Sequence, residues 1–236
     1  MSRGLPRKVK ISLEKAIDSS LLAVENYNKP AIKFKSGSYI VLMIIAWTAL
    51  FHSIFFKRKI KPFYRKPDSK RFIRIDGEYK YWELQKCLDK YFQSVTQNPV
   101  RNNLEFFIKL RNKIEHKSLP EIDSNIFGEC QSLLFNFDNL IEKEFGHKYC
   151  IREALTFSLQ LFPSTESLTN AIKINTVAQN ILNFINNYRS SISSNVIESG
   201  QYSFKAFLIQ VSNHQSRDAL PVQFIQWDKL SPTSTL

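Results

Sequence analysis

Glycine and cysteine are both scarce in this chain, and their scarcity excludes several kinds of site. Six glycines among 236 residues form neither a GxGxxG fingerprint nor a P-loop, which excludes those two phosphate-binding motifs. The three cysteines, Cys87, Cys130 and Cys150, are odd in number, far apart and not clustered with histidine. The sequence therefore predicts neither a disulfide framework nor a zinc site, and it favours a reducing cytoplasm. No metal ion and no cofactor is expected, and we interpret His147 and His214 as structural or surface residues.

The N-terminus is basic but lacks the apolar region of a secretion signal. One long uncharged run does occur, from Tyr39 to Phe56, and the basic residues 57–59 follow it directly. Its 18 residues are just enough to cross a bilayer, and the basic flank would suit an anchor with its positive side inside. Thr48, His52 and Ser53 interrupt the run, however, and the flanking amphipathic helices need an apolar partner. We predict a buried central helix, with a membrane anchor as the less favoured alternative.

Positive charge exceeds negative charge by 12, and much of this excess lies in one short segment. Between residues 57 and 74 nine basic residues accompany a single acid, Asp68. Phe63, Tyr64 and Phe72 are interleaved with them, which suits a polyanion with stackable bases. A solvated loop whose charge serves only solubility is the alternative. The predicted RNA-binding residues are Lys57, Arg58, Lys59, Lys61, Arg65, Lys66, Lys70, Arg71 and Arg74.

Apolar residues recur at helical spacing along most of the chain, which predicts a mainly α-helical fold. Helices are expected over about 12–28, 39–56, 81–92, 100–116, 123–145 and 166–191. A short β excursion is expected within 57–77, where two β-prone runs alternate with turn signals. Two more strands are predicted at 202–211 and 222–227. The expected division is a helical bundle over 1–150 and a small C-terminal α+β extension over 151–236.

The most informative stretch runs from Leu110 to His116, at the end of an amphipathic helix. On such a helix Asn112 and His116 share a face, and Arg111 lies on the flank beside them. A guanidinium binds phosphate oxygens in bidentate fashion, and an imidazole transfers protons near neutral pH. The pattern predicts a phosphate-handling site with Arg111, Asn112 and His116 as its catalytic residues. The plainer interpretation is a surface ion pair between Arg111 and Glu115 beside an exposed, helix-end histidine.

The motif Arg111-Asn112-x-x-x-His116 resembles the signature of the HEPN superfamily (higher eukaryotes and prokaryotes nucleotide-binding). Residues 21–30 and the segment around Trp47 also resemble a bacterial branch of that superfamily with no assigned function, so the resemblance spans roughly residues 11–150. It implies a helical bundle and, as in many members, a metal-independent ribonuclease of toxin–antitoxin, phage-defence or CRISPR systems. Related domains often carry an acid on the second helix. Here the run from Tyr39 to Phe56 contains no carboxylate, a departure that weakens the case for activity.

Three functions are open at this point. The first is a metal-independent endoribonuclease in which, as the resemblance implies, two subunits combine their copies of Arg111 and His116 at a dimer interface. The second is a catalytically inactive module that binds RNA or nucleotides through residues 57–74 within a defence complex. The third and least favoured is a membrane-anchored scaffold. The expected partners are RNA, a second copy of the chain in a homodimer, and an antitoxin or other defence-system protein, with no membrane.

Overall fold

The computed structural model describes residues 4–29, 31–93, 95, 97–115, 119, 122–123, 125–153 and 176–204. Within these ranges the chain is mainly α-helical with one small two-stranded sheet, as predicted. The elements are α1 (Arg7–Asn28), α2 (Lys35–Lys57), β1 (Arg74–Ile75), β2 (Glu78–Tyr79), α3 (Leu84–Phe92), α4 (Pro99–Ile114), α5 (Phe127–Phe145), the 3-10 turns η2 (His147–Tyr149) and η3 (Ile151–Glu153), α7 (Thr176–Ser190) and α8 (Ser194–Glu198).

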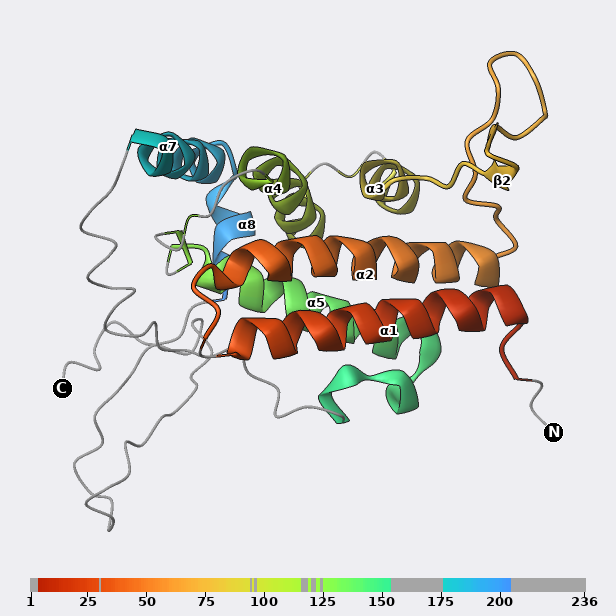
Figure 1. Ribbon diagram of the computed structural model, residues 1–236, viewed down its shortest axis with the longest axis horizontal. Coiled ribbons are helices and arrows are strands. Elements are labelled where there is room, and N and C mark those ends of the chain that lie inside the picture. Colours follow the sequence, from red (N-terminus) through yellow and green to blue (C-terminus); the bar gives the residue numbers. More distant parts are fainter. Residues whose placement is uncertain are drawn as a thin grey trace, which may run out of the picture.

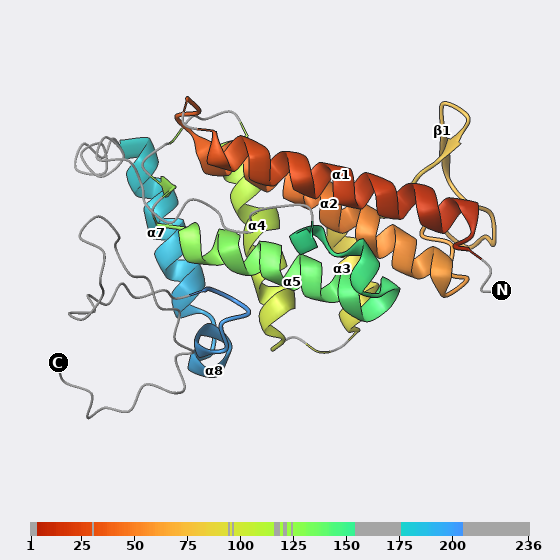
Figure 2. The ribbon, with the colours of Figure 1, turned by 90° about the horizontal axis from the view of Figure 1, so that it is seen from below.

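Helix α2 is the central helix of the bundle, as its uncharged sequence predicted. It runs antiparallel to α1, and α3, α4 and α5 pack against its other sides (Figures 1 and 2). Its Trp47 is fully buried and meets the ring of Phe137 of α5 edge-on, with 5.5 Å between the ring centroids. Among the described helices, α2 alone is long and apolar enough to cross a bilayer, and most of its apolar part is buried in the bundle. This burial fits the core helix of a soluble protein.

The N-terminus of α2 is capped by a residue that is distant in sequence. The carboxylate of Asp123 accepts hydrogen bonds from the backbone N–H groups of Lys35 (2.9 Å) and Ser36 (3.0 Å). A carboxylate at this position satisfies unpaired N–H groups and balances the helix dipole. The helix predicted over 123–145 was expected to begin at about Asp123, but the observed helix, α5, begins only at Phe127.

Helix α4 carries the first part of the Arg-Asn-x-x-x-His motif and has a well-defined start. The side-chain oxygen of Asn98 accepts a hydrogen bond from the backbone N–H of Arg101 (3.0 Å), and Pro99 occupies the first helical position. The helix ends at Ile114. His116, which was predicted to lie at the end of this helix, is outside the described residues.

The β excursion between α2 and α3 is a hairpin that projects from one end of the bundle (Figure 1). Strands β1 and β2 pair antiparallel, and an isolated bridge joins Arg65 to Phe72. These pairings confirm the predicted excursion and both of its turns. Tyr81 was predicted to open the next helix. It instead forms a bridge with Phe63, against whose ring its own ring packs at 4.7 Å, and α3 begins three residues later.

Helices α7 and α8 pack on the bundle and share its core. The side chains that they bury there are Ala178, Ile181, Ile185 and Val196. The side-chain amide of Asn103 in α4 donates to the backbone oxygen of Tyr202 (2.7 Å) and ties the segment after α8 to the bundle. Residues 202–204 form no strand, and the remainder of the two predicted strands, residues 166–175 of the predicted long helix and His214 lie outside the described residues.

Candidate functional site

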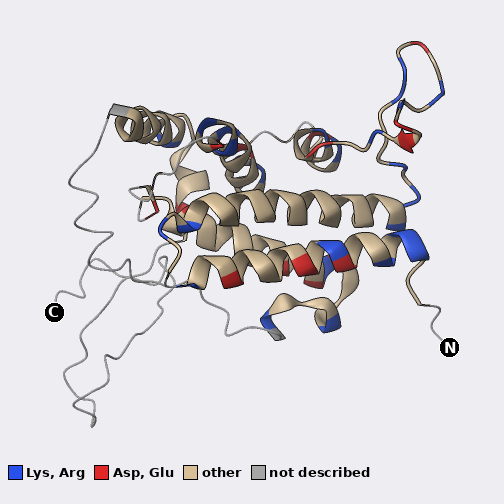
Figure 3. Ribbon diagram, viewed as in Figure 1, with Lys and Arg blue, Asp and Glu red and all other residues tan. Residues whose placement is uncertain are grey.

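A groove of about 930 Å³ lies between the hairpin and α3, and its lining is strongly basic. We call it the basic groove. Six cations line it, together with one aliphatic and four aromatic side chains, and none of its described lining residues is acidic. The cations are Lys59, Lys61, Arg65, Lys70, Lys86 and Lys90, and the other residues are Ile60, Phe63, Tyr64, Phe72 and Trp82. Figure 3 shows basic residues along the hairpin and almost no charge along the length of α2.

The structure places some of the predicted RNA-binding residues in this groove and others elsewhere. Four of the nine line it, namely Lys59, Lys61, Arg65 and Lys70. Lys57 and Arg58 contact the end of α5 instead: both approach Glu144, and the guanidinium lies 5.1 Å from the ring centroid of Tyr91. The remaining three, Lys66, Arg71 and Arg74, are exposed outside the lining.

Two cations of the groove, Lys86 and Lys90, were not predicted as RNA-binding residues. They come from α3, beyond the segment in which basic residues are concentrated. Their four-residue spacing places both side chains on one face of a helix. This spacing is the only sequence signal that could have indicated that the two lysines contribute to one site.

Aromatic side chains give the groove surfaces on which bases can stack. Tyr64, Phe72 and Trp82 are half-buried, so part of each ring stays accessible. The guanidinium of Arg65 lies 5.4 Å from the ring centroid of Phe72, and the buried ring of Phe63 packs edge-on against Phe72 at 5.4 Å. Cations and rings are thus interleaved, as in surfaces that track the phosphates of a single strand and stack its bases.

A second pocket of about 560 Å³ contains Arg111, and we call it the motif pocket. It lies between α1, one partly exposed face of α2, the hairpin residue Tyr81 and the end of α4. Its lining combines two cations and four neutral polar or titratable groups with five apolar residues. The lining residues are Ile11, Ser12, Lys15, Val41, Ile44, Ile45, Thr48, Ala49, His52, Tyr81 and Arg111.

Arg111 is held only loosely within this pocket. Its guanidinium nitrogen Nη2 lies 3.5 Å from Oε1 of Glu115, and the two side chains are 40% and 48% exposed. An exposed pair of this kind contributes roughly 0–1 kcal/mol, so the guanidinium can exchange the carboxylate for a phosphate. Asn112 is exposed and does not line the pocket. Of the three predicted catalytic residues, the structure therefore brings Arg111 to the pocket, leaves Asn112 outside it, and does not describe His116.

His52 lies in the same pocket, with its ring fixed by the backbone. Its Nε2 is 2.8 Å from the carbonyl oxygen of Trp82, and its ring centroid is 5.1 Å from that of Tyr81. Burial lowers the pKa of His52, the hydrogen bond to the Trp82 carbonyl opposes this in part, and the charge of Lys15 lowers it further. The imidazole is therefore mainly neutral at pH 7.

The basic groove and the motif pocket are adjacent. Tyr81 lines the motif pocket, while the next residue, Trp82, lines the basic groove. Phe63 of the groove packs against Tyr81 with 4.7 Å between the ring centroids. A single-stranded nucleic acid bound along the groove can therefore extend past Phe63 and Tyr81 toward Arg111.

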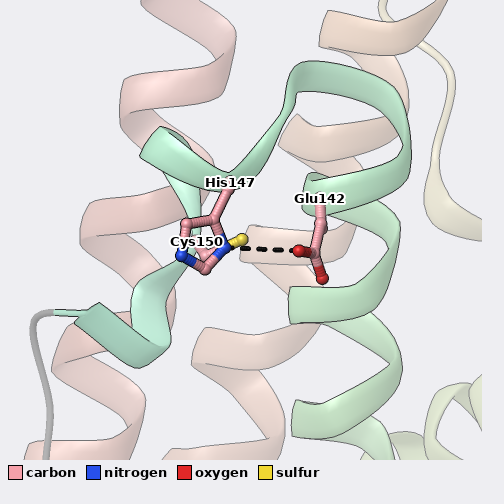
Figure 4. A group of neighbouring side chains, drawn as sticks. All are labelled: Glu142, His147 and Cys150. Atoms are coloured by element: carbon pink, nitrogen blue, oxygen red, sulfur yellow. Dashed lines mark hydrogen bonds and ion pairs between the residues drawn. The ribbon is translucent and has the colours of Figure 1, made fainter.

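A third group of side chains gathers where α5 ends. Glu142, His147 and Cys150 point toward one another, and their possible ligand atoms lie within 4.8 Å of one another (Figure 4). His147 was predicted to be a structural or surface residue without such neighbours. The spacing Glu-x4-His-x2-Cys is the sequence signal that could have indicated this group. Oε1 of Glu142 is 3.2 Å from Nδ1 of His147, while Oε2 takes a hydrogen bond of 2.7 Å from Arg152. Because this guanidinium already neutralises the carboxylate, the arrangement is an ion-pair network that joins η2 and η3 to α5.

The sequence matches a protein family over residues 11–192, a range that includes both the basic groove and the motif pocket. The family is described as Domain of unknown function (DUF3644). No curated protein and no solved structure matches the chain significantly.

Proposed function

We propose a function for this chain, which belongs to the DUF3644 family: it binds single-stranded RNA in the basic groove and cleaves it without a metal ion. The observation that carries the proposal is the composition of the groove. Six cations and three half-buried rings line one groove of about 930 Å³. Cations at this density bind a phosphate backbone, and accessible rings stack on bases that are not already stacked in a duplex.

Cleavage is supported by the position of Arg111 in the motif pocket, which is adjacent to this groove. A guanidinium that can leave its carboxylate partner is able to neutralise charge on a phosphate as the reaction proceeds. The Arg-Asn-x-x-x-His motif adds His116 as the group that transfers a proton. Using the ribose 2′-hydroxyl as the nucleophile restricts the reaction to RNA. The three cysteines are free and buried, which fits the cytoplasmic location that we propose with this function.

One observation favours the alternative, a module that binds RNA without cleaving it. The α2 face in the motif pocket offers Thr48 and His52, and no carboxylate is among the described residues that line this pocket. If an acid is needed there, the protein would be an RNA-binding subunit of a defence complex. An antitoxin or other defence-system partner remains a proposal that rests on the sequence resemblance.

The groove assignment predicts a defined loss of electrostatic binding. Changing Lys61 and Arg65 to glutamine should weaken binding of a single-stranded RNA. It should also lower the slope of log K against log salt by about 0.7 for each cation lost. Fluorescence anisotropy at several salt concentrations measures both quantities. The cleavage rate of saturated enzyme should stay close to that of the parent, because neither residue lines the motif pocket.

A matched control removes the same charge elsewhere. Lys29 and Lys33 are exposed near the turn between α1 and α2, at the end of the bundle opposite the hairpin (Figure 1). Changing both to glutamine should leave the salt slope of binding almost unchanged. Equal losses in the two double variants would show that net charge alone attracts RNA, and the groove would lose its assignment.

We also propose that the protein is a homodimer that pairs around the motif pocket. Three of its lining side chains are large, aliphatic and well exposed: Ile11, Val41 and Ile45. Grouped exposure of this kind marks an interaction surface, and isologous pairing would bring two copies of Arg111 together.

Dimerisation has a kinetic consequence that can be measured. The cleavage activity per subunit should fall on dilution, in parallel with dissociation followed by analytical ultracentrifugation. Changing Ile45 to glutamate should give a monomer with little activity, since a charge would then lie in the interface. A monomer that keeps its full activity per subunit at every concentration would contradict the dimer.

A further inference from the structure

We propose that His52 is the general base of the cleavage reaction and takes the proton of the ribose 2′-hydroxyl from a nucleotide held in the motif pocket. This inference rests on the proposed function and deepens it. His52 is on α2, outside the Arg-Asn-x-x-x-His motif, and it lies where related HEPN domains are expected to carry an acid.

The pocket brings together the groups that such a nucleotide needs. Arg111 of α4 and Lys15 of α1 supply two cations for one phosphate, and His52 lines the same cavity. The exposed ring of Tyr81 offers a face on which the base can stack. A volume of about 560 Å³ is within the range of pockets that hold small molecules.

The hydrogen bond of His52 determines which ring nitrogen can accept a proton. The carbonyl oxygen of Trp82 can only accept a hydrogen bond, so Nε2, 2.8 Å away, must carry a hydrogen. In the neutral ring the lone pair is then on Nδ1. The backbone therefore selects one tautomer and fixes the ring, as an orienting group does for a catalytic histidine.

The surroundings of His52 keep it in the basic form. Burial lowers its pKa, and the Trp82 carbonyl only partly offsets this effect. The charged groups that line the pocket are Lys15 from α1 and Arg111 from α4, and the charge of Lys15 lowers the pKa of His52 further. Tyr81, from the hairpin, has a pKa raised by burial and is neutral. At pH 7 the imidazole is thus ready to accept a proton.

The reaction that follows is balanced. The 2′-oxygen forms a bond to phosphorus as its proton moves to Nδ1 of His52, and the bond from phosphorus to the 5′-oxygen breaks. The leaving 5′-oxygen takes a proton from His116, the acid expected from the motif. The products are a 2′,3′-cyclic phosphate and a 5′-hydroxyl. Arg111 and Lys15 neutralise the charge that develops on the phosphate oxygens.

Two substitutions separate proton transfer from positioning. His52→Gln places an amide N–H where Nε2 was, so it can still donate to the Trp82 carbonyl, but it offers no base. His52→Ala removes both functions. Both variants should lower the single-turnover rate about 100-fold or more while binding a 2′-O-methyl RNA with the affinity of the parent. Added imidazole should restore part of the rate of His52→Ala.

The parent rate should fall as the pH drops through the pKa of His52, below 6.5, and both variants should lack this fall.

The outcomes distinguish this inference from the proposed function. If both variants cleave as fast as the parent, His52 is not the base, although the ribonuclease assignment stands. If His52→Gln is fast and His52→Ala slow without rescue by imidazole, His52 only positions Trp82, and the inference is overturned. If the parent binds RNA but never cleaves it, the ribonuclease assignment fails and this inference fails with it. Thermal unfolding of each variant identifies any loss that comes from misfolding, and His52→Gln then decides the question.

Discussion

Changing Arg111 to alanine is expected to slow RNA cleavage by about 100-fold or more, the loss that follows removal of one group that stabilises transition-state charge. Its guanidinium is the motif cation in the motif pocket and forms an ion pair there with the exposed carboxylate of Glu115, 3.5 Å away. His116→Ala should be similarly severe, because it removes the expected acid. Single-turnover cleavage with the enzyme in saturating excess over the RNA measures both effects and separates them from binding in the groove. Activity should persist in EDTA, and the DNA strand of the same sequence should stay intact.

Two neighbours of Arg111 provide controls. Lys113 lies two residues further along α4, but its ammonium is 4.8 Å from the ring centroid of Phe184, and it does not line the pocket. Lys113→Ala removes the same charge from the same helix end and should leave the rate nearly unchanged. Glu115→Gln weakens the ion pair of Arg111 and should not slow cleavage. If the Arg111→Ala variant cleaved RNA as fast as the Lys113→Ala variant, Arg111 would have no role in the reaction.

Substitutions in the basic groove and in the motif pocket should therefore change different kinetic parameters. Charges in the groove contribute to binding of substrate and transition state alike, so their loss should raise KM. Groups in the motif pocket act on the reacting phosphate, so their loss should lower kcat. A protein that only binds RNA would show the first class of effect and lack the second.

Local sequence patterns were enough to predict most of the helices. Apolar spacing of three and four residues located α4 and α5, and the uncharged run from Tyr39 to Phe56 correctly indicated a buried α2. The start of α4 has a local cause, because Asn98 caps the helix, Pro99 occupies its first position, and both effects act within a few residues. Gly146 ends α5 with a positive φ of 94°, which glycine adopts without strain.

The features that sequence did not reveal depend on contacts between distant residues. Asp123 caps α2 from 88 positions away, and no local pattern encodes such a pairing. His52 acquires its tautomer from a backbone carbonyl 30 positions along the chain. The charge run at 57–74 located the basic groove but not its full set of cations, since Lys86 and Lys90 reach it from α3. Conversely, Lys57 and Arg58 belong to that run but contact α5. Periodicity identifies elements, whereas a site depends on how the elements pack.

The second large effect concerns a buried ion pair that attaches α7 to the bundle. The side chain of Glu129 in α5 is 2% exposed. Its Oε1 accepts a hydrogen bond from Nε of Arg189 (2.8 Å) and lies 2.7 Å from Nη2 in the same ion pair. Changing Arg189 to methionine keeps much of the apolar side chain but leaves a buried carboxylate without its charged partner. We expect the free energy of unfolding to fall by about 3 kcal/mol at pH 7, the lower end of the range for breaking a buried pair. Urea denaturation measures it.

The pH dependence of this loss identifies its cause. Burial already raises the pKa of Glu129 and Arg189 opposes that rise, so removing Arg189 raises the pKa further. An acid whose pKa is raised by folding favours the folded state below its unfolded pKa, and this contribution is lost as the pH rises through the folded value. The deficit of Arg189→Met should thus be small near pH 4 and large at pH 7. Adding Glu129→Gln should remove most of it. A deficit that is equal at both pH values would instead indicate lost packing of α7 against α4, the helix that carries Arg111.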